Sequence, residues 1–216
     1  MPDHASSLAH HFDDLSQQKL ASTLGMWFFL VTEIMFFGGL FTGYAVYRST
    51  NGQAFASASG HLDIGLGAFN TAVLIASSLT MALAVHAAQM GKRNTIIVFL
   101  ILTLILGGVF LGVKAVEYSH KYHEHLIPGP SFQSGGPAAE AGGAELFFSF
   151  YFAMTGMHAL HMVVGFGLLI WMIILTLKGR FSASYYNPVE NMGLYWHFVD
   201  IIWIFLFPLL YLLGRN

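Results

Sequence analysis

The chain has 216 residues, of which 56% are hydrophobic and only 9% are charged, and its formal net charge is -2. A soluble domain usually carries about 25% charged residues, so this composition predicts an integral membrane protein and excludes a basic nucleic-acid-binding surface. The absence of cysteine excludes disulfides, thiolate metal sites, iron–sulfur clusters and cysteine nucleophiles.

A polar N-terminal segment, residues 1–19, lacks the basic start and the apolar core of a signal peptide, so insertion is expected to depend on the first spanning helix. Five apolar stretches follow, and each exceeds the roughly 20 residues that a helix needs to cross a bilayer. Lipid admits only helices and closed barrels, and the alternating pattern of barrel strands is absent. We therefore expect an all-α integral membrane protein whose residues 20–216 form a bundle of five transmembrane helices, at about 20–47, 62–89, 94–118, 144–177 and 189–213.

The longest connection, residues 121–143, is rich in proline, glycine and serine and is predicted to be a surface loop. It overlaps the histidine-rich run HKYHEH at 120–125. We interpret this run as a solvated interfacial segment, and a metal site is the alternative.

The last apolar stretch, residues 189–213, is preceded by residues typical of a helix N-terminus and has a proline near its other end. Asn187 can cap the helix, Pro188 suits the first helical position, and Glu190 is placed to bond back to the cap. Pro208 is expected to bend the helix or to mark its last turn.

Lysine and arginine are slightly more frequent on one side of the predicted bundle, five against four. Because cytoplasmic loops carry an excess of these residues, the bias favours an N-terminus inside and a C-terminus outside. The predicted inner side holds Lys19, Lys92, Arg93, Lys178 and Arg180, and the other side holds Arg48, Lys114, Lys121 and Arg215.

Small residues recur four positions apart on three of the stretches. In lipid this spacing lets helices approach closely. The helices that approach belong either to this bundle or to another subunit. The positions are Gly39 and Gly43, Gly108 and Gly112, and the stripe Ala68, Ala72 and Ala76.

Glu33 lies near the middle of the first stretch, where a charge is costly and no lysine or arginine lies within a turn of it. One interpretation is a protonated carboxyl that is hydrogen-bonded to a neighbouring helix. The other is a role in proton uptake or gating.

His158 and His161 share a face of the fourth stretch. That spacing suits a pair of metal or haem ligands, but it equally suits hydrogen bonds between helices or a proton or lipid contact. A complete ligand set would need further ligands, and His86 and His197 are the only other histidines within the spans.

Two further polar pairs are spaced three residues apart. His197 and Asp200 can form a relay or simply satisfy each other. Lys114 and Glu117 are predicted to form an interfacial ion pair.

Four segments together resemble one known family, subunit III of the haem–copper oxidases. They are WFFLVTEIMFFGGLF (27–41), FLGVKAVEY (110–118), FAMTGMHALHMVVGFGLL (152–169) and YWHFVDIIWIFLFPLLYL (195–212), one on each of four predicted helices and in the order of the family.

The resemblance implies a non-redox subunit that packs against catalytic subunit I, with haem and copper in partner subunits and no cofactor in this chain. It links the chain to assembly, lipid binding, oxygen access and sustained proton uptake. Glu33 then matches a buried helix carboxylate of the family, and His158 and His161 match its paired histidines. Glu117, His197 and Asp200 also fall on family motifs.

The resemblance further implies subunit III of an aa3-type cytochrome c oxidase in a bacterial plasma membrane, next to subunits I and II and also to a subunit IV or a larger supercomplex. The alternatives are a quinol oxidase subunit, a relative associated with nitric-oxide reductase, a small proton channel or transporter centred on Glu33, and a membrane haem protein. Longer members have seven helices and hold lipid in a cleft between the first two and the other five. This chain has only five predicted helices. Either a fused or separate subunit supplies the two missing helices, or the cleft is open.

Overall fold

The computed structural model describes residues 12–133, 138–183 and 185–213, and in these ranges the chain is helical. Five of the helices are long and apolar enough to cross a membrane, which confirms the all-α multi-pass fold. The elements are α1 (Leu15–Thr50), α2 (Gly52–Ser59), α3 (Ile64–Gln89), α4 (Arg93–His123), α5 (Ala138–Leu177), α6 (Asn187–Phe207) and the π-helix η2 (Pro208–Leu212).

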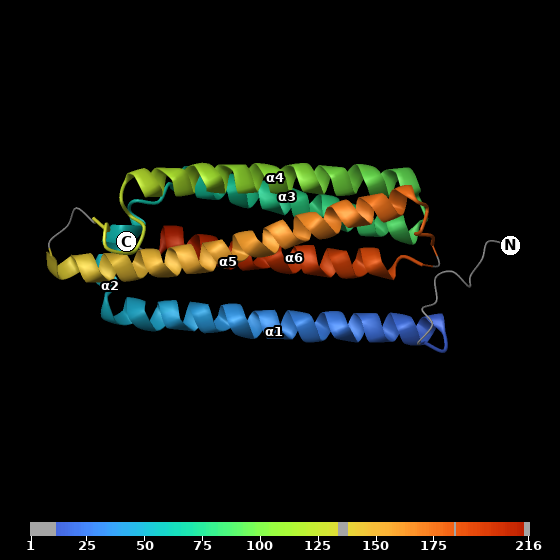
Figure 1. The fold of residues 1–216 in the computed structure, drawn as a ribbon, viewed down its shortest axis with the longest axis horizontal. Helices are drawn as coiled ribbons and strands as arrows, with labels where there is room; N and C mark the ends of the chain where they lie inside the picture. Colours follow the sequence, from blue (N-terminus) through green and yellow to red (C-terminus); the bar gives the residue numbers. More distant parts are fainter. Residues whose placement is uncertain (1–11, 134–137, 184, 214–216) are drawn as a thin grey trace.

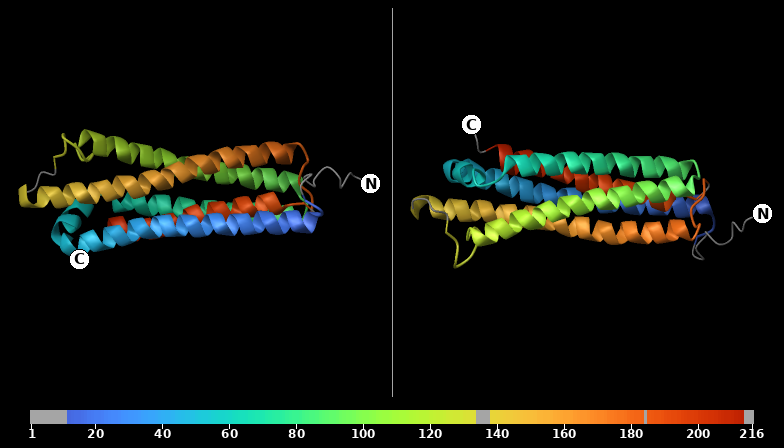
Figure 2. Two further views of the ribbon diagram at one scale, coloured as in Figure 1. Left: turned by 60° about the horizontal axis from the view of Figure 1, so that its bottom comes forward. Right: turned by 90° about the horizontal axis from the view of Figure 1, so that it is seen from above.

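The five long helices lie side by side in an elongated bundle, with α6 inside and α1 on one flank (Figures 1 and 2). In the most apolar part of the α6–η2 span, 56% of the residues are buried inside the protein, whereas in α1 the share is only 11%. Helix α1 reaches the bundle through α5 and α6. Most of its surface is therefore left for lipid or for another subunit.

Helix α1 begins at Leu15, inside the segment that was predicted to be only polar. The Asp14 side chain accepts a hydrogen bond from the backbone N–H of Gln17 at 2.7 Å and so caps the helix. Hydrogen bonds from Ser16 and Gln17 also hold the pKa of Asp14 below its usual value. A good cap thus extends the helix beyond the apolar stretch.

The predicted surface loop 121–143 is wrong at both ends, because α4 continues to His123 and α5 begins at Ala138. Lys121 is buried, and its ammonium group binds the carbonyl of His61 at 2.8 Å and the carboxylate of Glu124 at 2.6 Å. The run HKYHEH is therefore mostly the last turn of a helix. Pro137 of the predicted loop, residues 1–11 and Arg215 lie outside the described residues.

The predicted capping arrangement of α6 is wrong, although the proline is in the first turn as expected. Asn187 is already helical and Tyr186 takes the cap position, so Glu190 falls one place too late to bond back. Glu190 turns outward instead, toward Lys19 at 3.9 Å and the Gln89 amide at 3.4 Å. Pro208 does end the α-helix, and η2 follows it.

Several close contacts between helices occur at glycines that the four-residue spacing did not single out. A Cβ at Gly165 would lie 2.9 Å from the Trp196 ring, and one at Gly107 would lie 3.1 Å from the same ring. Trp196 is fully buried and fills the space between α4 and α5. A Cβ at Gly193 would lie 2.8 Å from Val85, which brings α6 against α3.

The glycines that the spacing did single out pack less closely. A Cβ at Gly43 would lie 3.4 Å from Phe150, and one at Gly108 would lie 3.9 Å from Phe166. At Gly39 and Gly112 a Cβ would meet nothing within 4 Å in the described part of the chain. Packing within this bundle therefore does not explain these two positions, and contact with another subunit remains a prediction for them.

We expect Gly39→Leu to leave the chain folded but to weaken its retention in an oligomeric complex. The side chain has free space within this chain, so a loss would report a neighbour. The control is Gly193→Leu, which should disturb the chain itself because Val85 occupies the space. Thermal unfolding of each isolated variant and its recovery with partner subunits are compared. Full recovery of the complex with Gly39→Leu would contradict the prediction.

Candidate functional site

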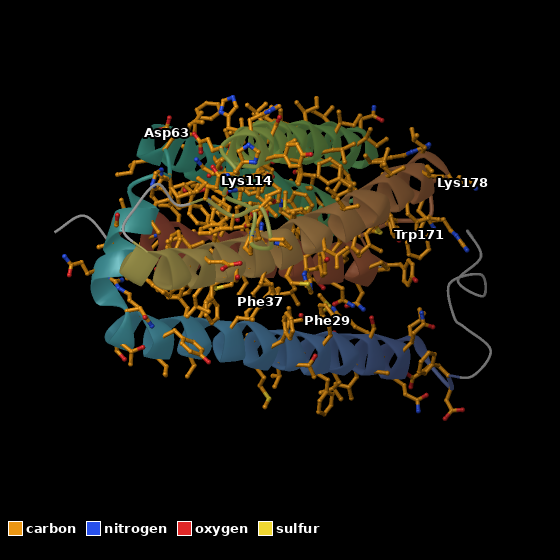
Figure 3. The ribbon with its side chains drawn as sticks, turned by 60° about the vertical axis from the view of Figure 1, so that its left-hand side comes forward. Phe29, Phe37, Asp63, Lys114, Trp171 and Lys178 are labelled. Atoms are coloured by element: carbon orange, nitrogen blue, oxygen red, sulfur yellow. The ribbon has the colours of Figure 1, made fainter. Side chains whose placement is uncertain are left out.

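Glu33 does not stand alone, because its carboxylate Oε2 lies 3.2 Å from Nε2 of His161 on α5. Both side chains are largely buried at the seam between α1 and α5. Phe29 and Phe37 point from α1 into the same seam (Figure 3), and the Phe37 ring lies 5.5 Å from the imidazole of His161. A hydrogen bond to a neighbouring helix was one of the two interpretations of Glu33, and the structure has it.

The geometry fixes how many protons the Glu33–His161 pair holds. The other ring nitrogen of His161, Nδ1, lies 2.8 Å from the backbone carbonyl of Met157. A carbonyl only accepts, so Nδ1 carries a proton. The contact with Glu33 then needs one further proton, either on the carboxyl of Glu33 or on Nε2 of His161. The pair can therefore hold one exchangeable proton between α1 and α5.

His158 and His161 share a helix face but bind different neighbours. Nε2 of His158 lies 3.1 Å from the carbonyl of Val199 on α6, and the ring lies 5.3 Å from those of Phe110 and Trp203. The two imidazoles therefore form contacts between helices, His158 with α6 and His161 with α1. Among the residues that the structure describes, no three His, Asp or Glu side chains converge as a metal-ligand set.

His197 and Asp200 do not satisfy each other, so that interpretation of the pair is wrong. Nδ1 of His197 is 2.7 Å from the hydroxyl of Ser78 on α3. Asp200 is buried, and the side chain of Ser78 is also the hydrogen-bond partner of its carboxyl. Both residues line a groove of about 340 Å³ between α3 and α6.

Lys114 and Glu117 do form an ion pair, at 2.9 Å, but it is buried inside the bundle rather than exposed at an interface. The ammonium group also donates to the hydroxyls of Tyr151, at 3.2 Å, and Tyr211, at 3.0 Å. Both tyrosines in turn donate to the Glu117 carboxylate. This four-residue cluster joins α4, α5 and η2. The tyrosines were missed because no sequence spacing relates them to Lys114.

Two further polar side chains within the spans have smaller roles. The Asn70 amide donates to the carbonyl of Phe110 at 3.5 Å, and so links α3 to α4. His86 is exposed and lines a second groove, of about 450 Å³, that shares Ala82 and His197 with the first.

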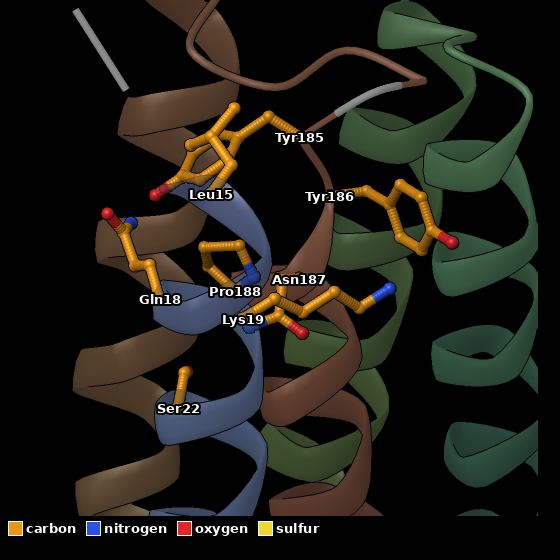
Figure 4. A pocket seen from close by; sticks show the side chains of 8 residues that line it. All are labelled: Leu15, Gln18, Lys19, Ser22, Tyr185, Tyr186, Asn187 and Pro188. Atoms are coloured by element: carbon orange, nitrogen blue, oxygen red, sulfur yellow. The ribbon is translucent and has the colours of Figure 1, made fainter. Parts of the chain in front are cut away.

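A small pocket of about 80 Å³ lies where the start of α1 meets the start of α6 (Figure 4). The Lys19 ammonium lies 5.1 Å from the centre of the Tyr186 ring, and the Asn191 amide donates to the Ser22 hydroxyl at 2.6 Å. These contacts fasten the otherwise exposed α1 to α6 at this end. The pocket is lined by Leu15, Gln18, Lys19, Ser22, Tyr185, Tyr186, Asn187 and Pro188.

The fold and its polar contacts define a multi-pass membrane protein whose intramembrane histidines and carboxylates bridge helices. A family model described as cytochrome c oxidase subunit III matches residues 7–125 and 137–215. The chain belongs to this family, subunit III of the haem–copper oxidases, which confirms the resemblance of the four motifs.

Named relatives cover nearly the whole chain. Quinol oxidase subunit 3 of Bacillus spizizenii is 31% identical over 204 residues, 92% of this chain and 90% of the relative. Cytochrome bo(3) ubiquinol oxidase subunit 3 of Pseudomonas aeruginosa is 29% identical over 97% of this chain and 93% of the relative. A probable cytochrome c oxidase subunit 3 of Nocardia farcinica is 31% identical over 95% of this chain and 94% of the relative.

Proposed function

We propose that this chain is a non-redox accessory subunit that packs against catalytic subunit I, beside subunit II, and supports proton uptake, oxygen access and lipid binding. Haem and copper belong to the partner subunits in this proposal, and this chain carries no cofactor. The Glu33–His161 pair is the observation that carries it. A one-proton pair inside a spanning region suits a subunit that assists the proton supply of a neighbour.

For the electron donor we propose cytochrome c, as in an aa3-type oxidase, and a quinol is the second candidate. The family description and the relative from Nocardia farcinica favour the first. The relatives from Bacillus spizizenii and Pseudomonas aeruginosa favour the second. The donor is recognised by partner subunits, so the similarity of this chain to both groups agrees with a role away from the donor site.

The proposed location is a bacterial plasma membrane, with the N-terminus in the cytoplasm and the C-terminus outside. The start of α1, the α3–α4 turn and the segment before α6 lie at one end of the bundle (Figure 1). Lys19, Lys92, Arg93, Lys178 and Arg180 belong to these segments. Their charge supports a cytoplasmic position for this end. A subunit IV and a larger supercomplex are further partners in the proposal.

Co-purification tests the proposal. A tagged chain is expected to bring down haem-containing subunits that consume oxygen, and the isolated chain is expected to have no Soret band. Oxygen consumption with reduced cytochrome c or with a quinol then identifies the donor. A stoichiometric Soret band in the isolated chain, or the lack of any haem-containing partner, would overturn the proposal.

We expect Glu33→Gln to leave the oxidase assembled but to lower proton uptake and sustained turnover. The Gln amide can still donate to Nε2 of His161, so the variant keeps the contact between the helices while removing the exchangeable proton. Glu33→Ala is the matched comparison, because it loses both the contact between the helices and the exchangeable proton. Oxygen consumption is followed over many turnovers together with proton uptake. Linear, wild-type turnover in Glu33→Gln would mean that Glu33 is structural.

A further inference from the structure

Ser78 of α3 joins His197 and Asp200 of α6, the two residues whose spacing suggested a relay. Nδ1 of His197 lies 2.7 Å from the Ser78 hydroxyl, and the same side chain is the hydrogen-bond partner of the Asp200 carboxyl. This carboxyl is buried, and both of its oxygens are closed off from solvent. A proton that reaches Asp200 must therefore pass through a neighbouring polar group, and Ser78 is the group that the structure places there.

The three side chains can be hydrogen-bonded in two ways, because a serine hydroxyl donates once and can also accept. In the first arrangement, Nδ1–H of His197 donates to Oγ of Ser78, and the hydroxyl donates to the ionised Asp200. In the second, the protonated Asp200 donates to Oγ, and the hydroxyl donates to Nδ1. Passing from the first to the second reverses both hydrogen bonds and adds one proton to Asp200.

A groove of about 450 Å³ between α1, α3 and α6 connects one end of the bundle with His197. It begins at Gln89, the last residue of α3, and at Glu190, in the first turn of α6. His197 is half-buried and lines the groove about 10 Å deeper than Glu190, at 1.5 Å per residue. The imidazole thus has Nδ1 on Ser78 and its other edge available to the groove.

The lining of this groove suits water. Besides His197, six of its lining residues are polar, and they come from three helices: Thr23, His86, Gln89, Asn187, Glu190 and Asn191. An ordered water needs two to four such partners. The titratable groups that face His197 here are His86 from α3 and Glu190 from its own helix, and Lys19 of α1 lies 3.9 Å from Glu190 at the mouth.

We propose that Asp200 is a second proton-holding site of this chain, separate from the Glu33–His161 pair, and that it fills from the groove through His197 and Ser78. A proton from water in the groove binds Nε2 of His197. The Nδ1 proton passes to Ser78 as the Ser78 proton passes to Asp200. The imidazole ends neutral, the hydroxyl is unchanged, and the carboxyl has gained one proton. Delivery of this proton to a catalytic subunit rests on the proposed function, whereas the relay itself does not.

Infrared spectroscopy of the full chain in lipid nanodiscs tests the relay. After transfer from water to heavy water, the carboxyl band that Asp200→Asn removes is followed in time, because its shift reports exchange of the Asp200 proton. Ser78→Ala is expected to slow this exchange about tenfold or more, since positioned proton-transfer groups contribute at least such factors. Ser78→Thr keeps the hydroxyl and should restore fast exchange.

Two results of this experiment would overturn the inference. Equal exchange rates in Ser78→Ala and the wild type would show that Ser78 carries no proton to Asp200. If Asp200→Asn removes no carboxyl band at any pH at which the chain stays folded, Asp200 holds no proton.

A block in the groove tests the side from which the proton enters. The chain contains no cysteine, so Gln89→Cys provides a single thiol at the start of the groove. A bulky maleimide on this thiol is expected to slow exchange at Asp200. The same label on Tyr122→Cys, at the other end of the bundle where the native side chain is 67% exposed, should leave the exchange unchanged. Unchanged exchange with the label at position 89 would overturn the groove as the route.

Failure of this inference and failure of the proposed function give different results. Exchange at Asp200 is measured on this chain alone, so slow exchange in Ser78→Ala supports the relay whether or not haem-containing subunits co-purify. Wild-type exchange in Ser78→Ala, together with co-purification of an oxidase, would remove the relay and leave the proposed function intact. If Ser78→Ala fails to fold, which thermal unfolding would reveal, the label at position 89 decides the inference.

Discussion

Replacing Glu117 with leucine is expected to destabilise the isolated chain by about 3–5 kcal/mol, because it leaves the ammonium group of Lys114 buried without its counter-charge. The two tyrosine hydroxyls around Lys114 can still accept hydrogen bonds, but they do not neutralise it. The change is measured by unfolding in mixed detergent micelles, followed by helix content.

The double variant Lys114→Met with Glu117→Leu is the matched control for this prediction. It removes both charges together, so no charge is left buried without its partner. We expect it to recover most of the stability, because an apolar pair can replace a buried ion pair at little cost. A double variant as unstable as Glu117→Leu would show that packing, and not the uncompensated charge, causes the loss.

The spanning helices could be predicted from the sequence because lipid imposes a length and an apolar composition that are visible in one dimension. The ends of these helices could not be predicted, because polar contacts determine where each helix begins and ends. The Asp14 cap starts α1 five residues earlier than the apolar stretch suggests. The buried Lys121 extends α4 because the His61 carbonyl and Glu124 accept its hydrogen bonds. Such partners come from distant or neighbouring polar residues that hydropathy does not register.

The candidate site shows a related limit. Spacing of three residues correctly placed His158 and His161 on one side of α5, but side chains about 60° apart on that side reach different helices. One meets Val199 on α6 and the other meets Glu33 on α1. For the same reason, the spacing of His197 and Asp200 suggested that the two side chains satisfy each other, whereas Nδ1 of His197 lies 2.7 Å from the Ser78 hydroxyl on α3. Helix spacing identifies which residues share a face, and only the packing of the bundle identifies their partners.

The close approach of α5 to α6 at Gly165 should tolerate substitution poorly. We expect Gly165→Val to destabilise the chain by about 3 kcal/mol, because its Cβ alone would lie 2.9 Å from the ring of Trp196. That ring has little freedom to move, since it is fully buried and its indole N–H donates to the Ser77 hydroxyl at 3.0 Å. The measurement is the same unfolding experiment in mixed micelles.

Gly167→Val on the same helix is the control, because a Cβ at Gly167 would meet nothing within 4 Å in the described part of the chain. The two variants share the effect of valine on helix propensity, so their difference isolates the contact with Trp196. Combining Gly165→Val with Trp196→Phe removes part of the ring that causes the clash and should restore some of the lost stability, as coupled neighbours do. Equal stability of the Gly165 and Gly167 variants would show that α5 and α6 can separate without loss, and that Trp196 does not hold the centre of the bundle.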